Sequence, residues 1–258
     1  GEYKSRIEFE GILSKNPSVK EMTDSINKMA EELENTEVLR SDFVNNFSHE
    51  FKTPIVSISG FAKLLKTENI TEEQRREYLD IIEEESRRLS AMATNVLNLT
   101  KVENQTILTD VSSFNLSEQI RTCVLILEDK WTAKQIDLQL DFDEISVVGS
   151  EELLRQVWLN LLDNAIKFTP CGGTVFIRIR QDEKSISVDV ANTGSSISSK
   201  DGERIFAKFY QCDTSHSTQG NGVGLAVVKR IVDLHSGIVF VESKNDMTTF
   251  TVMLPKIK

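Results

Sequence analysis

The chain is poor in cysteine, proline and glycine: its 258 residues include three Cys, four Pro and twelve Gly. The three cysteines, Cys123, Cys171 and Cys212, are odd in number and widely spaced, so they form neither a disulfide framework nor a C-x-x-C metal site. A reducing compartment is expected. The low glycine and proline content excludes a collagen-like chain and a broadly disordered one.

Basic residues are also scarce, because 30 Lys and Arg face 40 Asp and Glu and leave a formal charge of −10. Binding to a nucleic-acid backbone requires clustered basic side chains, so we expect no nucleic-acid partner. No apolar run approaches the roughly 18 residues of a membrane-spanning helix, and the acidic first ten residues do not resemble a signal peptide. Any membrane segment of the natural protein would therefore lie outside this sequence.

What the chain does contain is enough apolar material, 39% of its residues, for well-formed cores. A length of 258 residues predicts two modest domains. Residues 18–65 hold one Pro and one Gly, and their apolar residues follow a 4-3 spacing, which predicts a long helix with a coiled-coil-like seam. Ser18 and Glu21 have the spacing of a capping box at its start. Such a helix would reach ~70 Å, so it needs a partner helix.

The partner is predicted next in the sequence. Thr71 and Gln74 form a second capping-box pattern, and an apolar stripe then continues to about Lys101. Two amphipathic helices alone would leave apolar surface exposed to water. The pattern therefore favours an antiparallel helical hairpin that dimerises into a four-helix bundle, so a homodimer is expected.

The pattern changes after Glu103. Short β-like runs occur at 136–142, 174–180, 186–191, 238–242 and 248–254, and helical stretches occur at 116–131, 151–168 and 222–235. This alternation predicts a sheet layered with helices, an α/β two-layer sandwich. His235 closes the last helical stretch, where a partly cationic ring would complement the helix dipole; no functional role is assigned to it.

Three clusters of residues are candidates for a functional site. His49 lies about 200° around the first helix from Phe47 and is predicted to be exposed, although a lone surface histidine is most often only solvated. Pro54 removes a helical hydrogen bond nearby and is expected to bend the helix. An imidazole can accept a phosphoryl group at one ring nitrogen while a carboxylate takes the proton of the other.

In the second cluster, Asn160, Asn164 and Lys167 share one face of the 151–168 helix, beside a predicted core stripe that ends at Phe168. Amide oxygens are hard ligands and an ammonium group neutralises phosphate, although a solvated helix face would have the same pattern.

The third cluster is GNGVGL at 220–225. Its glycines let backbone amides approach phosphate at a helix start, but it lacks the G-K-[ST] of a Walker loop.

Together these clusters resemble the bacterial sensor histidine kinases of two-component systems, in order and over essentially the whole chain. The run FSHEFKTP at 47–54 resembles the phosphoacceptor box almost letter for letter. The runs NLLDNAIKFTP at 160–170, IFAKFY at 205–210 and GNGVGL at 220–225 are similar to the N, F and G2 boxes, and 211–219 to the ATP lid. The resemblance implies that the second domain has the Bergerat, or GHKL, fold.

The family resemblance also implies the chemistry. His49 would be autophosphorylated from ATP, Glu50 would be the base, and Thr53 would orient water for a phosphatase reaction. Asn164 would hold Mg²⁺, and the phosphoryl group would pass to an aspartate in the receiver domain of a response regulator. The implied nucleotide site comprises Asn160, Asn164, Lys167, Phe168, Asn192, Gly194, Ile197, Phe206, Tyr210, Gly220, Gly222, Val223, Gly224, Leu225 and Thr249.

The G1 box departs from the family pattern D-x-G-x-G. Here the run is NTGSSI at 192–197, so Asn192 replaces the aspartate that accepts the adenine amino proton, and Ser196 replaces a glycine. A neutral hydrogen bond from adenine to the Asn192 carbonyl remains possible. The departure leaves open a catalytically degenerate signalling scaffold of the same family, and with less weight an ATP-gated dimer clamp of the gyrase and MutL superfamily or a structural coiled-coil protein.

The resemblance divides the chain into three parts. Residues 1–40 resemble the end of a HAMP relay module, 41–104 the dimerisation and phosphoacceptor domain, and 105–258 the catalytic ATP-binding domain. The HAMP-like start implies that the chain is the cytoplasmic portion of a bacterial protein anchored in the inner or plasma membrane by segments upstream.

Overall fold

The computed structural model describes residue 7 and residues 17–67, 70–207, 210 and 223–256. Within its helices, only the backbone is described at 35–36, 39–40, 42–43, 46–47, 49–50, 199–200 and 203. The chain divides into two compact units, Gly1–Leu89 and Ser90–Lys258, which we call the helical unit and the α/β unit. Among the described residues, no helix is both long enough and apolar enough to cross a bilayer.

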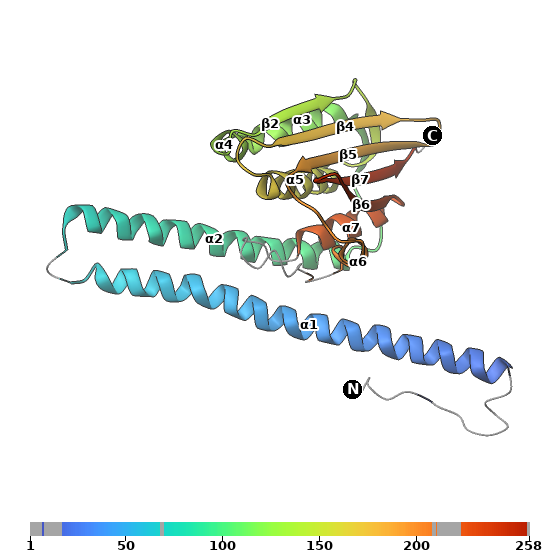
Figure 1. The fold of residues 1–258 in the computed structure, drawn as a ribbon, viewed down its shortest axis with the longest axis horizontal. Coiled ribbons are helices and arrows are strands. Elements are labelled where there is room, and N and C mark those ends of the chain that lie inside the picture. The colour runs from blue at the N-terminus through green and yellow to red at the C-terminus, as the bar shows by residue number, and fades with distance from the viewer. Residues whose placement is uncertain (1–6, 8–16, 68–69, 208–209, 211–222, 257–258) are drawn as a thin grey trace. The chain divides into compact units, whose positions relative to one another are not determined.

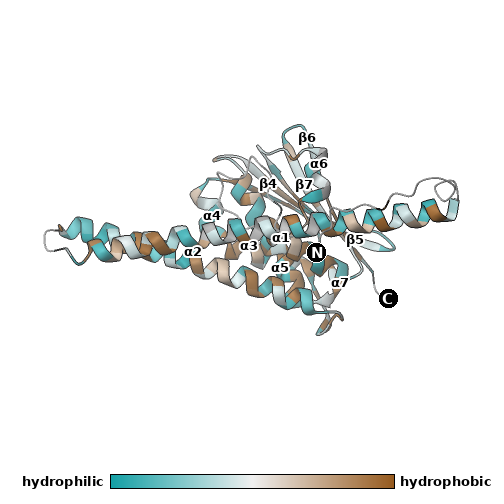
Figure 2. Ribbon diagram, turned by 90° about the horizontal axis from the view of Figure 1, so that it is seen from below, coloured by the Kyte–Doolittle hydropathy of each residue, from teal (hydrophilic) through white to brown (hydrophobic). Residues whose placement is uncertain are grey.

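The helical unit consists of α1 (Pro17–Leu64) and the first part of α2 (Glu72–Asn104). Helix α1 begins at Pro17, where proline is favoured because the first helical amide has no partner within the helix. Ser18 therefore lies inside the first turn, and the predicted start at Ser18 is one residue late. The helix continues through Pro54. Polar and apolar residues are interleaved along it (Figure 2).

The capping box predicted at the start of α2 is confirmed. The amide of Thr71 donates to Gln74 Oε1 at 3.1 Å, and the amide of Gln74 donates to Thr71 Oγ1 at 3.2 Å. These reciprocal bonds satisfy two amides that the helix itself leaves without partners. The rings of Phe61 in α1 and Tyr78 in α2 lie 5.3 Å apart, so the two helices form the predicted hairpin.

The α/β unit is built on a five-stranded sheet in the order β2-β4-β5-β7-β6 (Figure 1). Strands β2 and β4 are parallel, and the other pairs are antiparallel. Two further strands, β1 and β3, form a separate antiparallel pair that the sequence pattern did not predict. The strands are β1 (Val111–Asn115), β2 (Asp137–Asp141), β3 (Ser146–Ser150), β4 (Thr174–Gln181), β5 (Ser185–Thr193), β6 (Ile238–Lys244) and β7 (Met247–Pro255).

Helices cover the sheet: α5 packs against β5, α6 and α7 pack against β6, and α3 and α7 flank α5. The stretch predicted as one helix over 116–131 is two helices, because Leu127 leaves helical geometry with φ −99° and ψ 12°. The helices are α3 (Leu116–Ile126), α4 (Glu128–Ala133), α5 (Glu151–Phe168), α6 (Ser199–Arg204) and α7 (Gly224–Leu234). A helical region followed by a layered α/β domain is therefore confirmed.

Alternation along the central strands defines the core side of the sheet. Val188 pairs with Val252 and Val190 pairs with Phe250, and all four side chains are buried. Because successive side chains of a strand point to opposite faces, Asn192, two residues after Val190, and Thr248, two residues before Phe250, share this core side. Both are buried, which brings polar groups to the edge of the core.

Candidate functional site

Helix α5 presents the two faces that the sequence predicted. Leu154, Trp158, Leu161 and Ala165 are almost completely buried, whereas the polar face remains partly accessible. That polar face carries Asn160, Asn164 and Lys167, each half-buried. The helix thus holds two amide side chains and an ammonium group along one accessible stripe.

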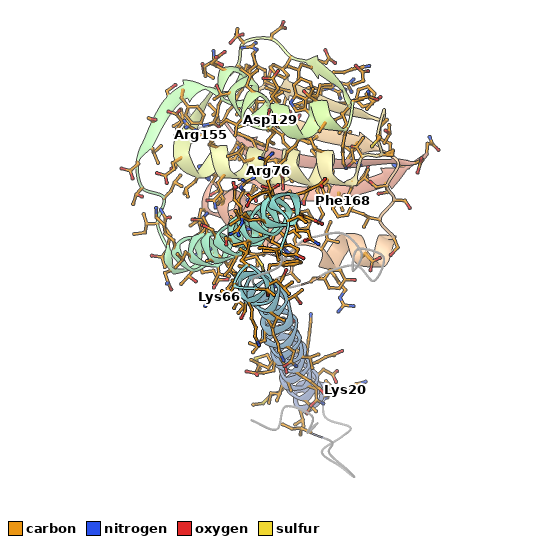
Figure 3. The ribbon with its side chains drawn as sticks, turned by 90° about the vertical axis from the view of Figure 1, so that its left-hand side faces the viewer. Lys20, Lys66, Arg76, Asp129, Arg155 and Phe168 are labelled. Atoms are coloured by element: carbon orange, nitrogen blue, oxygen red, sulfur yellow. The ribbon has the colours of Figure 1, made fainter. Side chains whose placement is uncertain are left out.

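Phe168 does not belong to the core stripe as predicted. It is the last residue of α5, its side chain is 36% exposed, and it is labelled at the end of that helix in Figure 3. Lys167 Nζ lies 4.8 Å from the centroid of the Phe168 ring, within the range of a cation–π contact. The core stripe ends at Ala165 and Ile166 because the backbone turns extended at Thr169.

Lys134 fixes the end of α5 from outside the helix. Its ammonium group donates to the carbonyl oxygens of Ile166, Lys167 and Thr169 at 2.7 to 3.0 Å. These carbonyls have no amide partner within the helix, and the positive charge also complements the negative end of the helix dipole. The backbone beneath Lys167 is therefore held in place independently of its own side chain.

The start of α7 approaches the polar face of α5. The helix begins at Gly224, two residues later than predicted, and Val223 before it is buried. A Cβ atom added at Gly224 would lie 3.3 Å from Asn160 Oδ1, so glycine permits this close approach. Leu225 is half-buried in the first turn of α7. The predicted site residues Gly220 and Gly222, like the whole predicted lid, lie outside the described residues.

Asn192 is only 2% exposed, and its amide is oriented by the chain that follows it. Nδ2 donates to Ser195 Oγ at 2.8 Å and to the carbonyl oxygen of Thr193 at 3.3 Å. No donor among the described residues is bonded to Asn192 Oδ1. The nitrogen of the Asn192 side chain is therefore bonded within the protein, and its oxygen is available to another partner.

Gly194 makes the turn after β5 possible. Its φ is 79°, and a Cβ atom there would lie 2.5 Å from Pro170 Cδ, closer than any side chain tolerates. The amide of Gly194 donates to the carbonyl of Asp246 at 2.9 Å. Asn245 and Asp246 both have positive φ, as a tight two-residue hairpin requires, so this turn replaces the glycine-containing one that the family pattern leads one to expect.

Thr248, which our sequence analysis did not name, lies beside Asn192 in the candidate site. It pairs with Asn192 across the strands, is 1% exposed, and donates from Oγ1 to the carbonyl of Ser195 at 2.8 Å. Thr249, which we predicted instead, points to the opposite face of the sheet because strand side chains alternate. The sequence could have indicated Thr248, because Phe250 is a core residue and the residue two positions before it lies on the same face of the strand.

Three more of the predicted site residues contact neighbouring elements of the α/β unit. The amide of Ile197 donates to Ser243 Oγ at 3.0 Å, and Phe206 packs edge-on against Phe250 with centroids 6.3 Å apart. The hydroxyl of Tyr210 donates to Asp201 Oδ1 at 2.6 Å. This bond, together with one from Ser198, holds the pKa of Asp201 below its usual value.

The predicted phosphoacceptor segment lies within α1. His49 and Glu50 occupy helical backbone, but their side chains, and so the predicted exposure of the imidazole, lie outside the described residues. Thr53 is exposed one turn further along. A helix places residues four apart on one side, so Thr53 and His49 share a side of α1.

His235 differs from the expectation of a partly cationic ring. It is buried, its Nε2 accepts from the amide of Ser150 at 3.1 Å, and its Nδ1 lies 2.8 Å from the carbonyl of Ile231. The carbonyl can only accept, so Nδ1 carries the proton and the ring is neutral. Burial lowers the pKa of His235, and the ring serves as a structural link between β3 and α7.

The residues present fit a nucleotide with Mg²⁺. Asn164 makes no hydrogen bond with the described residues and lies one turn from Asn160, so its amide oxygen is available to a hard cation. The oxygen of Asn192 is available to a base. At Gly224 the absence of a side chain leaves the backbone amides at the start of α7 accessible to phosphate oxygens. Because α5 packs on both β5 and α7, these groups come from neighbouring elements of the α/β unit.

Two family models match this chain. The model described as His Kinase A (phospho-acceptor) domain matches residues 39–105, and the model described as Histidine kinase-, DNA gyrase B-, and HSP90-like ATPase matches residues 149–258. The first match includes His49, and the second includes every predicted nucleotide-site residue from Asn160 to Thr249.

The chain is also similar in sequence to curated proteins. The chain is 34% identical over 233 residues to the heme sensor protein HssS of Staphylococcus saprophyticus, which covers 89% of this chain and 50% of that protein. It is 33% identical over 231 residues to HssS of Staphylococcus aureus, again covering 89% of this chain and 50% of that protein. The chain thus spans about half the length of the curated relatives it matches.

A solved structure is also similar. The histidine kinase ThkA, in complex with the response regulator protein TrrA, matches with a TM-score of 0.69 and 26% sequence identity. The match covers 89% of this chain and 66% of that one.

Proposed function

The chain belongs to the sensor histidine kinases of bacterial two-component systems, and from this premise we propose that it transfers the γ-phosphoryl group of ATP to His49. The observation that carries the proposal is the pair of family matches, one containing His49 and the other containing Asn160, Asn164 and Gly224. The polar face of α5 and the oriented amide of Asn192 support a nucleotide site in the α/β unit.

In the proposed step, one ring nitrogen of His49 attacks the γ-phosphorus of ATP. The bond from that phosphorus to the bridging oxygen breaks, and ADP leaves with the electron pair. Glu50 takes the proton from the other ring nitrogen, which leaves a neutral phosphorylated imidazole. An in-line displacement of this kind depends on positioning and charge neutralisation rather than on further covalent chemistry.

The α/β unit would supply that positioning. Asn164, with Asn160 beside it, would hold Mg²⁺, which neutralises phosphate charge when bound. Lys167 lies on the same stripe and adds a positive charge, and the amides at the start of α7 would bind phosphate oxygens. Asn192 and Thr248 would meet the base at the end of β5.

Further steps follow from the family. We propose that the phosphoryl group passes from His49 to an aspartate in the receiver domain of a response regulator, with Thr53 orienting water in a reverse phosphatase reaction. The complex of ThkA with a response regulator supports such a partner. We also propose that the chain acts as a homodimer.

The domain limits are part of the proposal. We propose a HAMP-like segment over 1–40, a dimerisation and phosphoacceptor domain over 41–104, and a catalytic domain over 105–258. In the full-length protein this region would be the cytoplasmic portion of a membrane-anchored sensor. The partial coverage of the curated relatives leaves room for such upstream segments.

The test is incubation of the chain with γ-labelled ATP and Mg²⁺. We expect protein-bound label that survives alkali and is lost in acid, because phosphohistidine is labile to acid. His49→Gln is expected to abolish the label and to leave binding of Mg-ATP unchanged. Label that persists on the His49→Gln variant would place the acceptor at another residue.

The second candidate is a signalling scaffold without catalysis, which the Asn192 substitution motivates. It predicts that Mg-ATP binds while no acid-labile label forms on His49 under any condition. The same labelling experiment therefore separates the two functions. The solved structure of the histidine kinase ThkA favours the kinase, since its match covers 89% of this chain.

A further inference from the structure

The last turn of α5 lacks the partners that a helix gives its earlier carbonyl groups. The carbonyl of Ile166 would accept from the amide four residues later, but residue 170 is proline and has no amide proton. The amide of Thr169 bonds back to the carbonyl of Ala165 at 3.0 Å, and its hydroxyl donates to the same carbonyl at 2.6 Å. The helix therefore ends with carbonyl groups that need donors from elsewhere in the chain.

Lys134 supplies those donors with its whole ammonium group. Nζ lies 2.9 Å from the carbonyl oxygen of Ile166, 2.7 Å from that of Lys167 and 3.0 Å from that of Thr169. An ammonium group has three protons, so each carbonyl can receive one. The shortest of the three bonds is the one to Lys167. The carbonyl of Lys134 also accepts from the amide of Gly172 at 2.9 Å, so its backbone holds the turn that follows α5 as well.

Lys130, four residues before Lys134, makes a different contact with the same helix. Its ammonium group donates to Asp163 Oδ1 at 2.5 Å, and its side chain is 60% exposed. Ion pairs at the surface are screened by water and contribute little. Lys134 is instead half-buried and bonds to the backbone. Of the two lysines, it is Lys134 that reaches the turn of α5 on which Lys167 lies.

We propose that Lys134 is a positioning residue for nucleotide binding, which fixes the last turn of α5 so that the ammonium group of Lys167 meets the phosphates of ATP. The inference rests on the proposed function, because it takes Lys167 as a contact of the phosphates. Without the three bonds from Lys134, the carbonyl groups at the end of α5 would turn toward water and the last turn would fray. Lys167 would then sample several backbone conformations, and binding would lose the benefit of a preorganised side chain.

The test is a double-mutant cycle on binding of Mg-ATP to the full 258-residue chain, measured by isothermal titration. Its single variants are Lys134→Met and Lys167→Met, and its fourth corner carries both substitutions. Methionine keeps an unbranched apolar side chain but donates no hydrogen bond. We expect each single variant to weaken Mg-ATP binding by roughly 5- to 10-fold. The double variant is expected to bind little more weakly than Lys167→Met alone, because Lys134 acts through Lys167.

Lys130→Met is the matched control, because it removes the same charge from the same part of the chain and leaves the end of α5 bonded. It is expected to keep the affinity for Mg-ATP within about 2-fold of wild type. Thermal unfolding verifies that each variant is folded at the temperature of the titration. If Lys134→Met is not folded there, Lys134→Gln takes its place in the cycle, because its amide group keeps two donated protons.

Losses of affinity that simply add would overturn the positioning role, because a residue with a general structural role weakens binding whether or not Lys167 is present. An equal loss in Lys130→Met would overturn it too, since the effect would then come from net charge. Unchanged affinity in Lys167→Met would remove the contact through which Lys134 is proposed to act. In each of these cases, acid-labile label on His49 would still support the kinase. Failure of the wild-type chain to bind Mg-ATP would instead overturn the proposed function, and this inference with it.

Discussion

Gly172 and Gly194 are the two glycines with positive φ, 74° and 79°, among the described residues. They differ in their surroundings. A Cβ atom at Gly172 would meet nothing within 4 Å, whereas one at Gly194 would lie 2.5 Å from Pro170 Cδ and 2.7 Å from Pro170 Cγ. The pair therefore separates the cost of backbone conformation from the cost of steric overlap at the turn that follows Asn192.

Replacing each glycine with alanine is expected to give different losses of stability. Gly172→Ala incurs only the left-handed conformation, about 1 to 2 kcal/mol. Gly194→Ala adds an overlap with the proline ring, typically another 1 to 3 kcal/mol. Urea unfolding followed by tryptophan fluorescence measures the difference, because Trp131 and Trp158 both lie in the α/β unit.

Gly172→Ala is the matched control for that experiment. Equal losses of unfolding free energy in the two variants would mean that Pro170 moves aside without cost, and that the turn is less rigid than its contacts indicate. Gly194→Ala is expected to lose more unfolding free energy than Gly172→Ala. It is also expected to weaken Mg-ATP binding, because the turn carries Asn192 and Ser195.

Sequence reasoning found some site residues and missed others for a physical reason. Asn160, Asn164 and Lys167 could be predicted, because a helical period places them on one face. Thr248 could not be recognised from the motif alone, since adjacent threonines look alike and only the phase of the strand separates Thr248 from Thr249. The orientation of the Asn192 amide depends on its hydrogen bond to the carbonyl of Thr193, and no spacing rule encodes it.

At the scale of elements, a buried polar link joins α3 to α5. Trp158 Nε1 donates to Gln119 Oε1 at 2.8 Å, and Gln119 Nε2 donates to the carbonyl of Glu151 at 2.8 Å. Trp158 is 1% exposed and Gln119 is 5% exposed, so water cannot easily replace either partner. The link fixes the helix whose other face carries Asn160 and Asn164.

Gln119→Leu is expected to destabilise the α/β unit by about 1 to 3 kcal/mol, because it leaves the buried Trp158 Nε1 without an acceptor. Trp158→Phe in the same background removes that group. The double variant is therefore expected to lose less unfolding free energy than the sum of the single variants, by about 1 kcal/mol. Urea unfolding monitored by far-UV circular dichroism gives all three values.

The single variant Trp158→Phe supplies the remaining corner of that cycle. It loses packing and leaves Gln119 Oε1 without its donor. Strict additivity of the two substitutions would show that the Gln119 to Trp158 bond contributes nothing beyond packing.

Elements were predicted well where the sequence period is strong. The predicted limits of 151–168 for α5 match the observed ones, because Glu151 follows a strand and Pro170 follows the end. Strand β1 was missed because Val111–Asn115 is mostly exposed and shows no alternation. The break at Leu127 between α3 and α4 contains no Pro or Gly that would indicate it in the sequence, so only tertiary packing defines it.

At the scale of the whole molecule, α1 carries an apolar face that one chain leaves open. Met22, Met29, Leu33, Val44 and Ile55 are all exposed. Their spacings of seven, four, eleven and eleven residues are close to whole numbers of helical turns, so they share one face. Val56 is exposed too but points about 100° away from Ile55.

An open apolar face of this length is expected to be covered by a second copy of the chain. We therefore predict that the chain sediments as a dimer, with twice its mass of 29.2 kDa. Ile55→Glu places a charge on the shared face, and burying an unpaired carboxylate is costly. The variant is expected to dissociate at protein concentrations at least 10-fold higher than wild type, which sedimentation equilibrium measures.

Val56→Glu is the matched control, because the two residues are adjacent and similarly exposed, 50% for Ile55 and 59% for Val56. It adds the same charge on another side of the helix and is expected to leave the dimer intact. If both variants dissociated equally, the effect would come from net charge rather than from the shared face. If neither did, the apolar face of α1 would not be the contact, and the dimer would have to form through α2.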